Sequence, residues 1–152
     1  MPAAFHPDRL RASLAPLGAR QPLSAQAQDY QRFYGLALSS HSWLGGFQAA
    51  GFDLVGQVWL PERPVATLFV LHGYYDHMGL YRHVIEWALK LGYAVISCDL
   101  PGHGLSSGER ASIRDFALYQ QVLDALFEQA RGLDLPRPWH LCGQLSLIHI
   151  SE

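Results

Sequence analysis

The sequence predicts an α/β fold with a mostly parallel sheet and crossover helices. Three largely apolar segments, at 66–71, 93–100 and 139–143, indicate strands; the first has no polar alternation and is expected to be buried on both faces, and the second is expected to be buried. Segments with a helical period lie between these runs, at 80–91 and 112–132. Strands and helices that alternate in this way form βαβ units, so we expect the three strands to lie parallel in one sheet.

An antiparallel hairpin and a helix are predicted ahead of these units. Residues 43–60 are rich in aromatic and β-branched residues and are interrupted at Ala50-Gly51, which favours a turn between two strands. Ser24 is placed to cap a helix with apolar residues three or four positions apart. Residues 1–21 have only weak periodicity and are expected to form a loose lead-in with one or two helical turns.

Composition excludes several classes of partner. The chain has 152 residues, of which 49% are apolar and 16% charged, with a net charge of -2 and no cluster of Lys or Arg. This balance argues against nucleic acid or an anionic membrane as the main partner. The sequence contains neither a signal-peptide pattern nor an apolar run long enough to span a bilayer, so we expect a cytoplasmic protein without an integral membrane segment. The sequence contains no pattern that predicts the oligomeric state.

The two cysteines indicate buried thiols and not a disulfide. Cys98 and Cys142 each lie inside an apolar strand, which suits small buried residues in a reducing compartment.

The candidate site lies where the strand at 66–71 ends. His72-Gly73 follows that strand directly, and a loop of aromatic and polar residues follows the glycine. Open α/β sheets bind their ligands at the carboxyl ends of parallel strands. We therefore expect the chemistry of this protein to take place at this edge.

Three motifs carry a resemblance to a known family. They are His72-Gly-Tyr-Tyr-Asp-His77 with Tyr81, then Asp99-Leu-Pro-Gly-His-Gly-Leu-Ser106, then Cys142-Gly-Gln144. In this order and at this spacing, the chain resembles the N-terminal half of an α/β-hydrolase, in the branch of monoacylglycerol lipases and serine aminopeptidases. The resemblance implies an α/β-hydrolase fold, N-terminal half only, that ends at the nucleophile strand.

The same resemblance implies a division of the chain and an order of its strands. It assigns a lead-in and helix to 1–42 and a partial α/β-hydrolase domain to 43–144, and leaves 145–152 as a tail that we expect to be non-native. The strand ending at Leu71 should lie between the strands that end near Asp99 and Gly143. The last of these then becomes an open edge, so we expect poor solubility.

The resemblance also implies a role for the loop after His72. Acyl transfer builds negative charge on the substrate carbonyl oxygen, and a fixed backbone N–H can stabilise that charge. In this family the donor corresponds to the N–H of Tyr74, and Gly73 allows the close approach of substrate. The residues expected to shape the surrounding loops are His72, Asp76, His77, Asp99, Gly102, Gly104 and Gly143.

Two other chemistries fit the sequence less well. The segment from His72 to His77 differs by one residue from the H-x-H-x-D-H zinc motif, but Tyr74 replaces a histidine ligand. The glycines of 102–108 do not have the spacing of the dinucleotide motif G-x-G-x-x-G, and no acidic residue follows at the required place. We therefore expect neither a metal nor a cofactor.

The nucleophile motif G-x-S-x-G is broken. Aligned on Gly143, Leu145 occupies the serine position and Leu147 the final glycine position, while Ser146 is one residue out of place. The tail 145–152 resembles the translation of sequencing-adapter DNA, so we expect it to be non-native.

The sequence thus predicts a serine hydrolase of the esterase or acylglycerol lipase type, present as a truncated and inactive fragment. Its partner is expected to be a small-molecule ester or acylglycerol. Two alternatives remain: a non-catalytic binding protein that keeps the α/β-hydrolase fold, and a zinc metallohydrolase.

Overall fold

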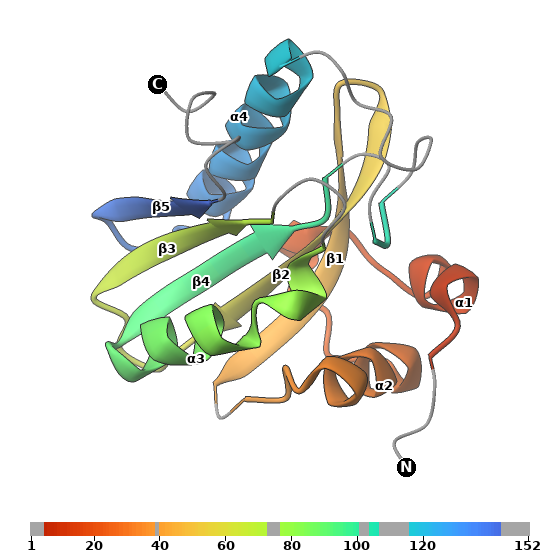
Figure 1. Ribbon diagram of the computed structural model, residues 1–152, viewed down its shortest axis with the longest axis horizontal. Coiled ribbons are helices and arrows are strands. Elements are labelled where there is room, and N and C mark those ends of the chain that lie inside the picture. The colour runs from red at the N-terminus through yellow and green to blue at the C-terminus, as the bar shows by residue number, and fades with distance from the viewer. Residues whose placement is uncertain (1–4, 39, 73–76, 101–103, 107–115, 144–152) are drawn as a thin grey trace.

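The computed structural model describes residues 5–38, 40–72, 77–100, 104–106 and 116–143 (Figure 1). In these residues, five strands form one sheet in the order β1-β2-β4-β3-β5. The strands are β1 (His41–Ala49), β2 (Phe52–Leu60), β3 (Ala66–Leu71), β4 (Tyr93–Cys98) and β5 (Trp139–Gly143). The helices are α1 (Pro7–Ala12), α2 (Ala25–Tyr34), α3 (Arg82–Lys90) and α4 (Phe116–Gly132), and short 3-10 turns lie at Leu17–Ala19 and Met78–Leu80.

The hairpin and the parallel strands are present as predicted. β1 and β2 pair antiparallel, and both turn residues have positive φ, at 52° for Ala50 and 81° for Gly51. Such angles suit a tight turn between twisted strands. β3 pairs parallel with β4 on one side and with β5 on the other. The predicted position of β3 between the other two parallel strands is therefore confirmed.

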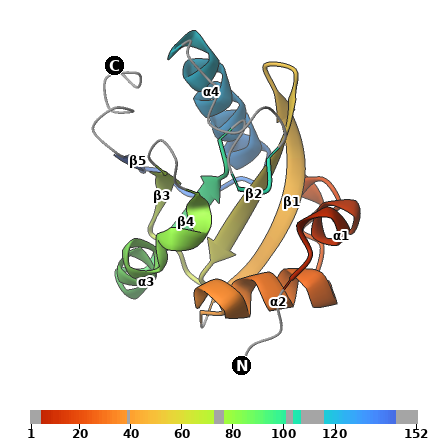
Figure 2. The same ribbon diagram turned by 45° about the vertical axis from the view of Figure 1, so that its right-hand side comes forward.

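Helices cover both faces of the sheet (Figures 1 and 2). α4 packs on one face, where Phe69 and Ile96 belong to the same buried cluster as Val122 and Leu126. α1, α2 and α3 cover the other face, where Leu68 and Val95 belong to a second cluster. All six residues of β3 are buried, which explains why five of them are apolar and why no polar alternation occurs.

Strand β4 is shorter than predicted. It ends at Cys98 and not at residue 100: the Asp99 N–H still donates to the Val55 carbonyl on β2, but the Leu100 N–H donates to the His72 side chain and not to a neighbouring strand. β5 is only partly buried, since it lies at the edge of the sheet in the described residues. This agrees with the prediction that the strand ending near Gly143 forms an open edge.

The lead-in is more firmly packed than its sequence suggests. Leu10 and Leu17 are completely buried, and the indole N–H of Trp43 donates to the Leu17 carbonyl at 2.8 Å. The N–H of Gly46 on β1 donates to the carbonyl of Ala15. Long-range contacts of this kind leave no periodic pattern, so the sequence alone predicted a loose segment.

The helix boundaries follow local signals. The Ser24 side chain accepts the N–H of Ala27 and caps α2 as predicted, and α2 ends at Gly35 with φ of 69°. α3 begins at Arg82, later than expected, because residues 78–80 form a separate 3-10 turn. The predicted start of the next helix at Ser112 lies outside the described residues.

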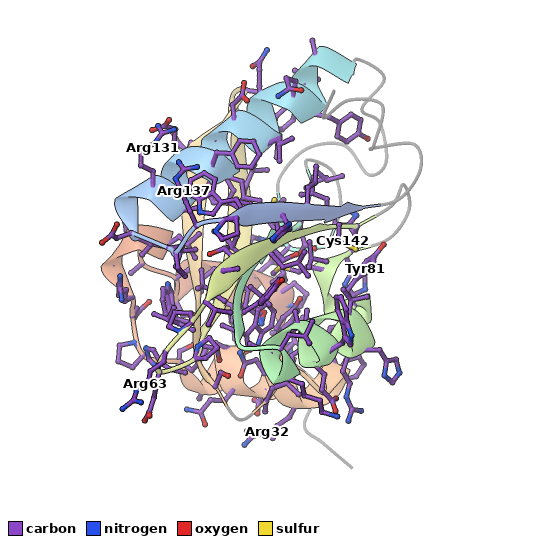
Figure 3. The ribbon with its side chains drawn as sticks, turned by 90° about the vertical axis from the view of Figure 1, so that its left-hand side faces the viewer. Arg32, Arg63, Tyr81, Arg131, Arg137 and Cys142 are labelled. Atoms are coloured by element: carbon purple, nitrogen blue, oxygen red, sulfur yellow. The ribbon has the colours of Figure 1, made fainter. Side chains whose placement is uncertain are left out.

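The two cysteines lie on different strands and opposite faces. Cys98 packs in the cluster on the α4 side, whereas Cys142 extends from β5 toward the side that α3 covers (Figure 3). Both are free thiols, as the strand order requires. Burial, and secondarily the Asp99 carboxylate, raises the pKa of the Cys98 thiol well above its usual range.

The thiols should therefore differ in reactivity. Because only the thiolate is nucleophilic, we expect iodoacetamide at pH 8 to alkylate Cys142 at least about tenfold faster than Cys98. Peptide mapping by mass spectrometry of the folded chain measures both rates, and the urea-unfolded chain provides the control in which the two rates converge. Equal rates in the folded chain would contradict the burial of Cys98.

The close packing of Gly45 against Leu17 yields a prediction about stability. A Cβ added there would lie 2.3 Å from Leu17 Cα, whereas one added at Gly18 would meet nothing within 4 Å. Backbone atoms cannot yield as a flexible side chain does, so Gly45→Ala should destabilise the fold by about 3 kcal/mol. Gly18→Ala is the matched control and should change stability by less than about 0.5 kcal/mol. Urea unfolding followed by circular dichroism gives both values, and equal midpoints would refute the close packing.

Candidate active site

The candidate site lies at the carboxyl ends of the three parallel strands. In the sheet register Leu71 lies opposite Cys98 on one side and Gly143 on the other. The residues that follow β3 and β4 therefore begin next to each other, beside the end of β5 (Figure 1). The structure thus brings His72, Asp99 and Gly143 to one edge of the sheet.

His72 joins the ends of β3 and β4. Its side chain is fully buried, and its Nε2 accepts the N–H of Leu100 at 2.8 Å. A ring nitrogen that accepts a hydrogen bond carries no proton, so the bond assigns the neutral imidazole with the proton on Nδ1. The 4.0 Å approach of Asp99 Oδ1 to the same nitrogen is therefore not an ion pair.

Asp99 connects the two loops that leave these strands. Its carboxylate is fully buried, and Oδ1 accepts the N–H of Met78 at 2.8 Å while Oδ2 accepts the N–H of Leu105 at 2.8 Å. Hydrogen bonds to a charged group contribute about 1.5–3 kcal/mol each. One carboxylate therefore holds the chain after β3 and the chain after β4 in fixed positions.

The turn after β4 is fitted closely around this carboxylate. A Cβ at Gly104 would lie 2.3 Å from Asp99 Oδ2, and the residue has φ of 49°. Both the space and the backbone angle require glycine there. The Ser106 hydroxyl donates to the Asp99 carbonyl at 2.6 Å and accepts the N–H of Val55 at 3.0 Å, which ties the turn to β2.

His77 holds the far end of the loop that follows β3. Its Nδ1 accepts the N–H of Gly79 at 3.2 Å, and its ring packs at 4.9 Å against the ring of Tyr34 on α2. The imidazole therefore caps the short 3-10 turn and connects that turn to the helical layer.

Several predicted site residues lie outside the described residues. These are Gly73, Tyr74, Asp76 and Gly102, together with the tail positions Leu145, Ser146 and Leu147. Sequence reasoning gave no separate role to Ser106, although it ends the second motif. It also gave none to Tyr30 and Tyr34, which face Asp99 only because α2 packs against this edge.

The described residues contain no group of three His, Cys, Asp or Glu side chains arranged to hold a metal ion. His72 Nε2 and His77 Nδ1 both accept backbone N–H groups, so these two lone pairs are already engaged. Nor does any helix in the described ranges combine the length and apolar character needed to cross a bilayer.

Solved structures support the fold. An esterase from Pyrococcus furiosus, Pf2001, superposes with a TM-score of 0.59 and 22% identity, covering 74% of this chain and 44% of that one. The α/β-hydrolase GrgF from Penicillium gives a TM-score of 0.60 with 18% identity, covering 67% and 37%. At these identities the likeness shows the fold alone.

Curated relatives match over part of the chain. Phospholipase YtpA of Bacillus subtilis is 40% identical over 78 residues, which is 51% of this chain and 30% of the relative. The monoglyceride lipase of Homo sapiens is 36% identical over 110 residues, which is 68% of this chain and 36% of the relative. The chain thus spans about a third of the length of these relatives.

The family model described as "Serine aminopeptidase, S33" matches residues 62–144. This range runs from the end of the hairpin to the end of β5. It contains all three motifs, together with Asp99 and the residues Met78 and Leu105 that bond to its carboxylate. Because the match covers more than half of the chain, the protein belongs to the serine aminopeptidase S33 family of α/β-hydrolases.

Proposed function

We propose that this protein derives from a serine hydrolase that cleaves small esters or acylglycerols. One observation supports the proposal: the residues on either side of 73–76 are held in place, His72 by its bond to Leu100 and Met78 by its bond to Asp99, at the edge where β5 also ends. Stabilisation of a tetrahedral oxyanion requires donors that are held in place before the reaction. Flanking residues held in this way would support a backbone donor between them, and such a donor needs no catalytic side chain.

We propose the residue roles that the family resemblance implies. The N–H of Tyr74, two residues beyond the anchored His72, acts as the oxyanion donor. His72, His77, Asp99 and Gly104 position the loops through the contacts described above, while Gly143 ends β5 where the nucleophile turn begins. In the parent enzyme a serine on that turn attacks the acyl carbonyl, with a histidine as general base and an acidic residue to orient it.

The class of substrate is proposed from the relatives. The matching proteins are named phospholipase, monoacylglycerol lipase and monoglyceride lipase, which all point to lipid esters. We therefore propose a small-molecule lipid ester as partner and no cofactor. A cytoplasmic location stays a prediction, and the two free thiols support it.

We further propose that the chain with this sequence is inactive. Leu145 stands where the nucleophilic serine is required, and a backbone donor alone does not form an acyl-enzyme. The same substitution is the specific observation that favours the second candidate, a non-catalytic protein that keeps the scaffold for binding.

A fluorophosphonate probe separates these candidates. We expect no labelling of the 152-residue chain, and labelling of the protein expressed with the native DNA that follows codon 144, which should encode a serine directly after Gln144. Changing that serine to alanine is the control and should abolish labelling. A native reading frame without G-x-S-x-G would overturn the hydrolase proposal and favour the binding protein.

The anchoring of the loop can be tested independently of activity. In Asp99→Asn the side-chain amide nitrogen would face one of the two donors, leaving the N–H of Met78 or Leu105 buried without an acceptor. This change should destabilise the fold by about 2 kcal/mol. Asp124→Asn alters an exposed carboxylate on α4 and should change stability by less than about 0.5 kcal/mol. Urea midpoints for the two variants are compared with that of the original chain, and equal values for all three would contradict the role of Asp99.

A further inference from the structure

A small cavity of about 170 Å³ lies behind the candidate site, between the N-terminal segment, α2 and the turns that follow β3 and β4. Its walls include Phe5, Tyr30, Tyr34, His77, Asp99 and Leu105. Figure 2 shows how α1 and α2 lie beside this end of the sheet. A water molecule occupies about 30 Å³ in the liquid, so the cavity has room for a small organic molecule.

Three aromatic rings line one side of the cavity. The ring of Tyr30 packs edge to face with Phe5 and with Tyr34, in each case at 5.2 Å between centroids. Phe5 also lies 5.9 Å from Tyr34, so the three rings form one cluster. The faces of such rings carry negative electrostatic potential and attract cations.

Two polar groups complete the cavity. The carboxylate of Asp99 lines it, with both oxygens already accepting backbone N–H groups as an ionised carboxylate does. Tyr30 is 1% exposed, and its hydroxyl has no hydrogen-bond partner among the described residues. Buried hydroxyls are rarely left without a partner, so this one points to a group that the cavity is built to receive.

The protonation state of Tyr30 determines which hydrogen bonds its hydroxyl can form. Burial, followed by the charge of Asp99, raises the pKa of Tyr30 well above its usual range, and the same two causes raise the pKa of Tyr34. Tyr30 is therefore a neutral phenol at physiological pH, and its oxygen can accept a hydrogen bond.

Arg11 bonds to a residue of the cavity wall but does not line the cavity. Its guanidinium donates to the carbonyl of Leu105 at 3.4 Å and forms an ion pair with Asp8. The cavity lining contains Asp99 and the aromatic rings but no Lys or Arg among the described residues. The imidazole of His77 also lines it, with Nδ1 accepting the N–H of Gly79.

We propose that this cavity binds a small primary ammonium cation. Its N–H groups donate to the Tyr30 hydroxyl and to the Asp99 carboxylate, and its alkyl part lies against the rings of Phe5 and Tyr34. A neutral alcohol of equal size lacks the charge, and a quaternary ammonium lacks the N–H that the hydroxyl accepts. The cavity shares Asp99 and His77 with the candidate active site, but binding there does not need the nucleophile.

Isothermal titration of the 152-residue chain tests this site at constant ionic strength. We expect ethylammonium chloride to bind saturably with one site, and ethanol to bind at least about tenfold more weakly. Tetramethylammonium should bind through the rings alone and more weakly than ethylammonium. Equal affinity for ethanol and ethylammonium, or no saturable binding of ethylammonium, would overturn the proposal.

A pair of phenol-to-phenyl variants assigns the contact. Tyr30→Phe removes only the hydroxyl that lacks a partner, so the fold should persist by circular dichroism, while ethylammonium affinity falls about tenfold and tetramethylammonium affinity stays within about twofold. Tyr119→Phe also removes a phenol hydroxyl, but from α4 on the opposite face of the sheet, and should leave both affinities unchanged. Unaltered ethylammonium binding in Tyr30→Phe, or an equal loss in Tyr119→Phe, would refute the assigned hydroxyl.

Discussion

The arrangement at the carboxyl edge of the sheet depends on one buried carboxylate. A charge without solvent is costly unless hydrogen bonds surround it, and Asp99 meets this condition through two backbone N–H groups from two different loops. Neither loop could move away without leaving the charge or a donor unsatisfied. The requirement also explains Gly104, whose missing side chain makes room for the carboxylate. The hydrogen bonds to Asp99 thus stabilise the fold and also fix the positions of Met78 and Leu105.

Much of the fold could be predicted from local sequence because local residues determine it. β3 is buried on every side, so its six residues are uniformly nonpolar in character apart from Thr67, whose hydroxyl donates to the Pro136 carbonyl. The hairpin turn at Ala50-Gly51 follows in the same way from backbone angles that few residues adopt. The end of β4 could not be predicted, because periodicity does not reveal that the groups beyond Cys98 bond to His72 and Val55.

In the candidate site, too, some features could be predicted from local sequence and others depend on long-range contacts. His72, His77 and Asp99 could be singled out because they belong to motifs that resemble those of α/β-hydrolases. The contacts they make could not be predicted, since Asp99 and Ser106 bond to groups outside their own motif, as Ser106 does to Val55, 51 positions earlier. Tyr30 lies outside every motif, 69 positions before Asp99, and looks like an ordinary helix residue in the sequence. Its position near Asp99 arises only when α2 packs against the sheet, and that packing is a property of the whole apolar face.

The contacts described for the residues on either side of 73–76 come from residues that precede the nucleophile turn. Val55, Asp99, Leu100 and Ser106 belong to the hairpin and the first βαβ unit, so these supporting contacts require no residue beyond β5. Backbone donors need only a rigid support, whereas covalent catalysis needs a specific side chain. Family membership is therefore shown by this part of the fold, which the family model matches at 62–144. In the mechanism proposed above, the backbone donor depends on these supporting contacts, whereas an acyl-enzyme depends on the side chain at the position that Leu145 occupies.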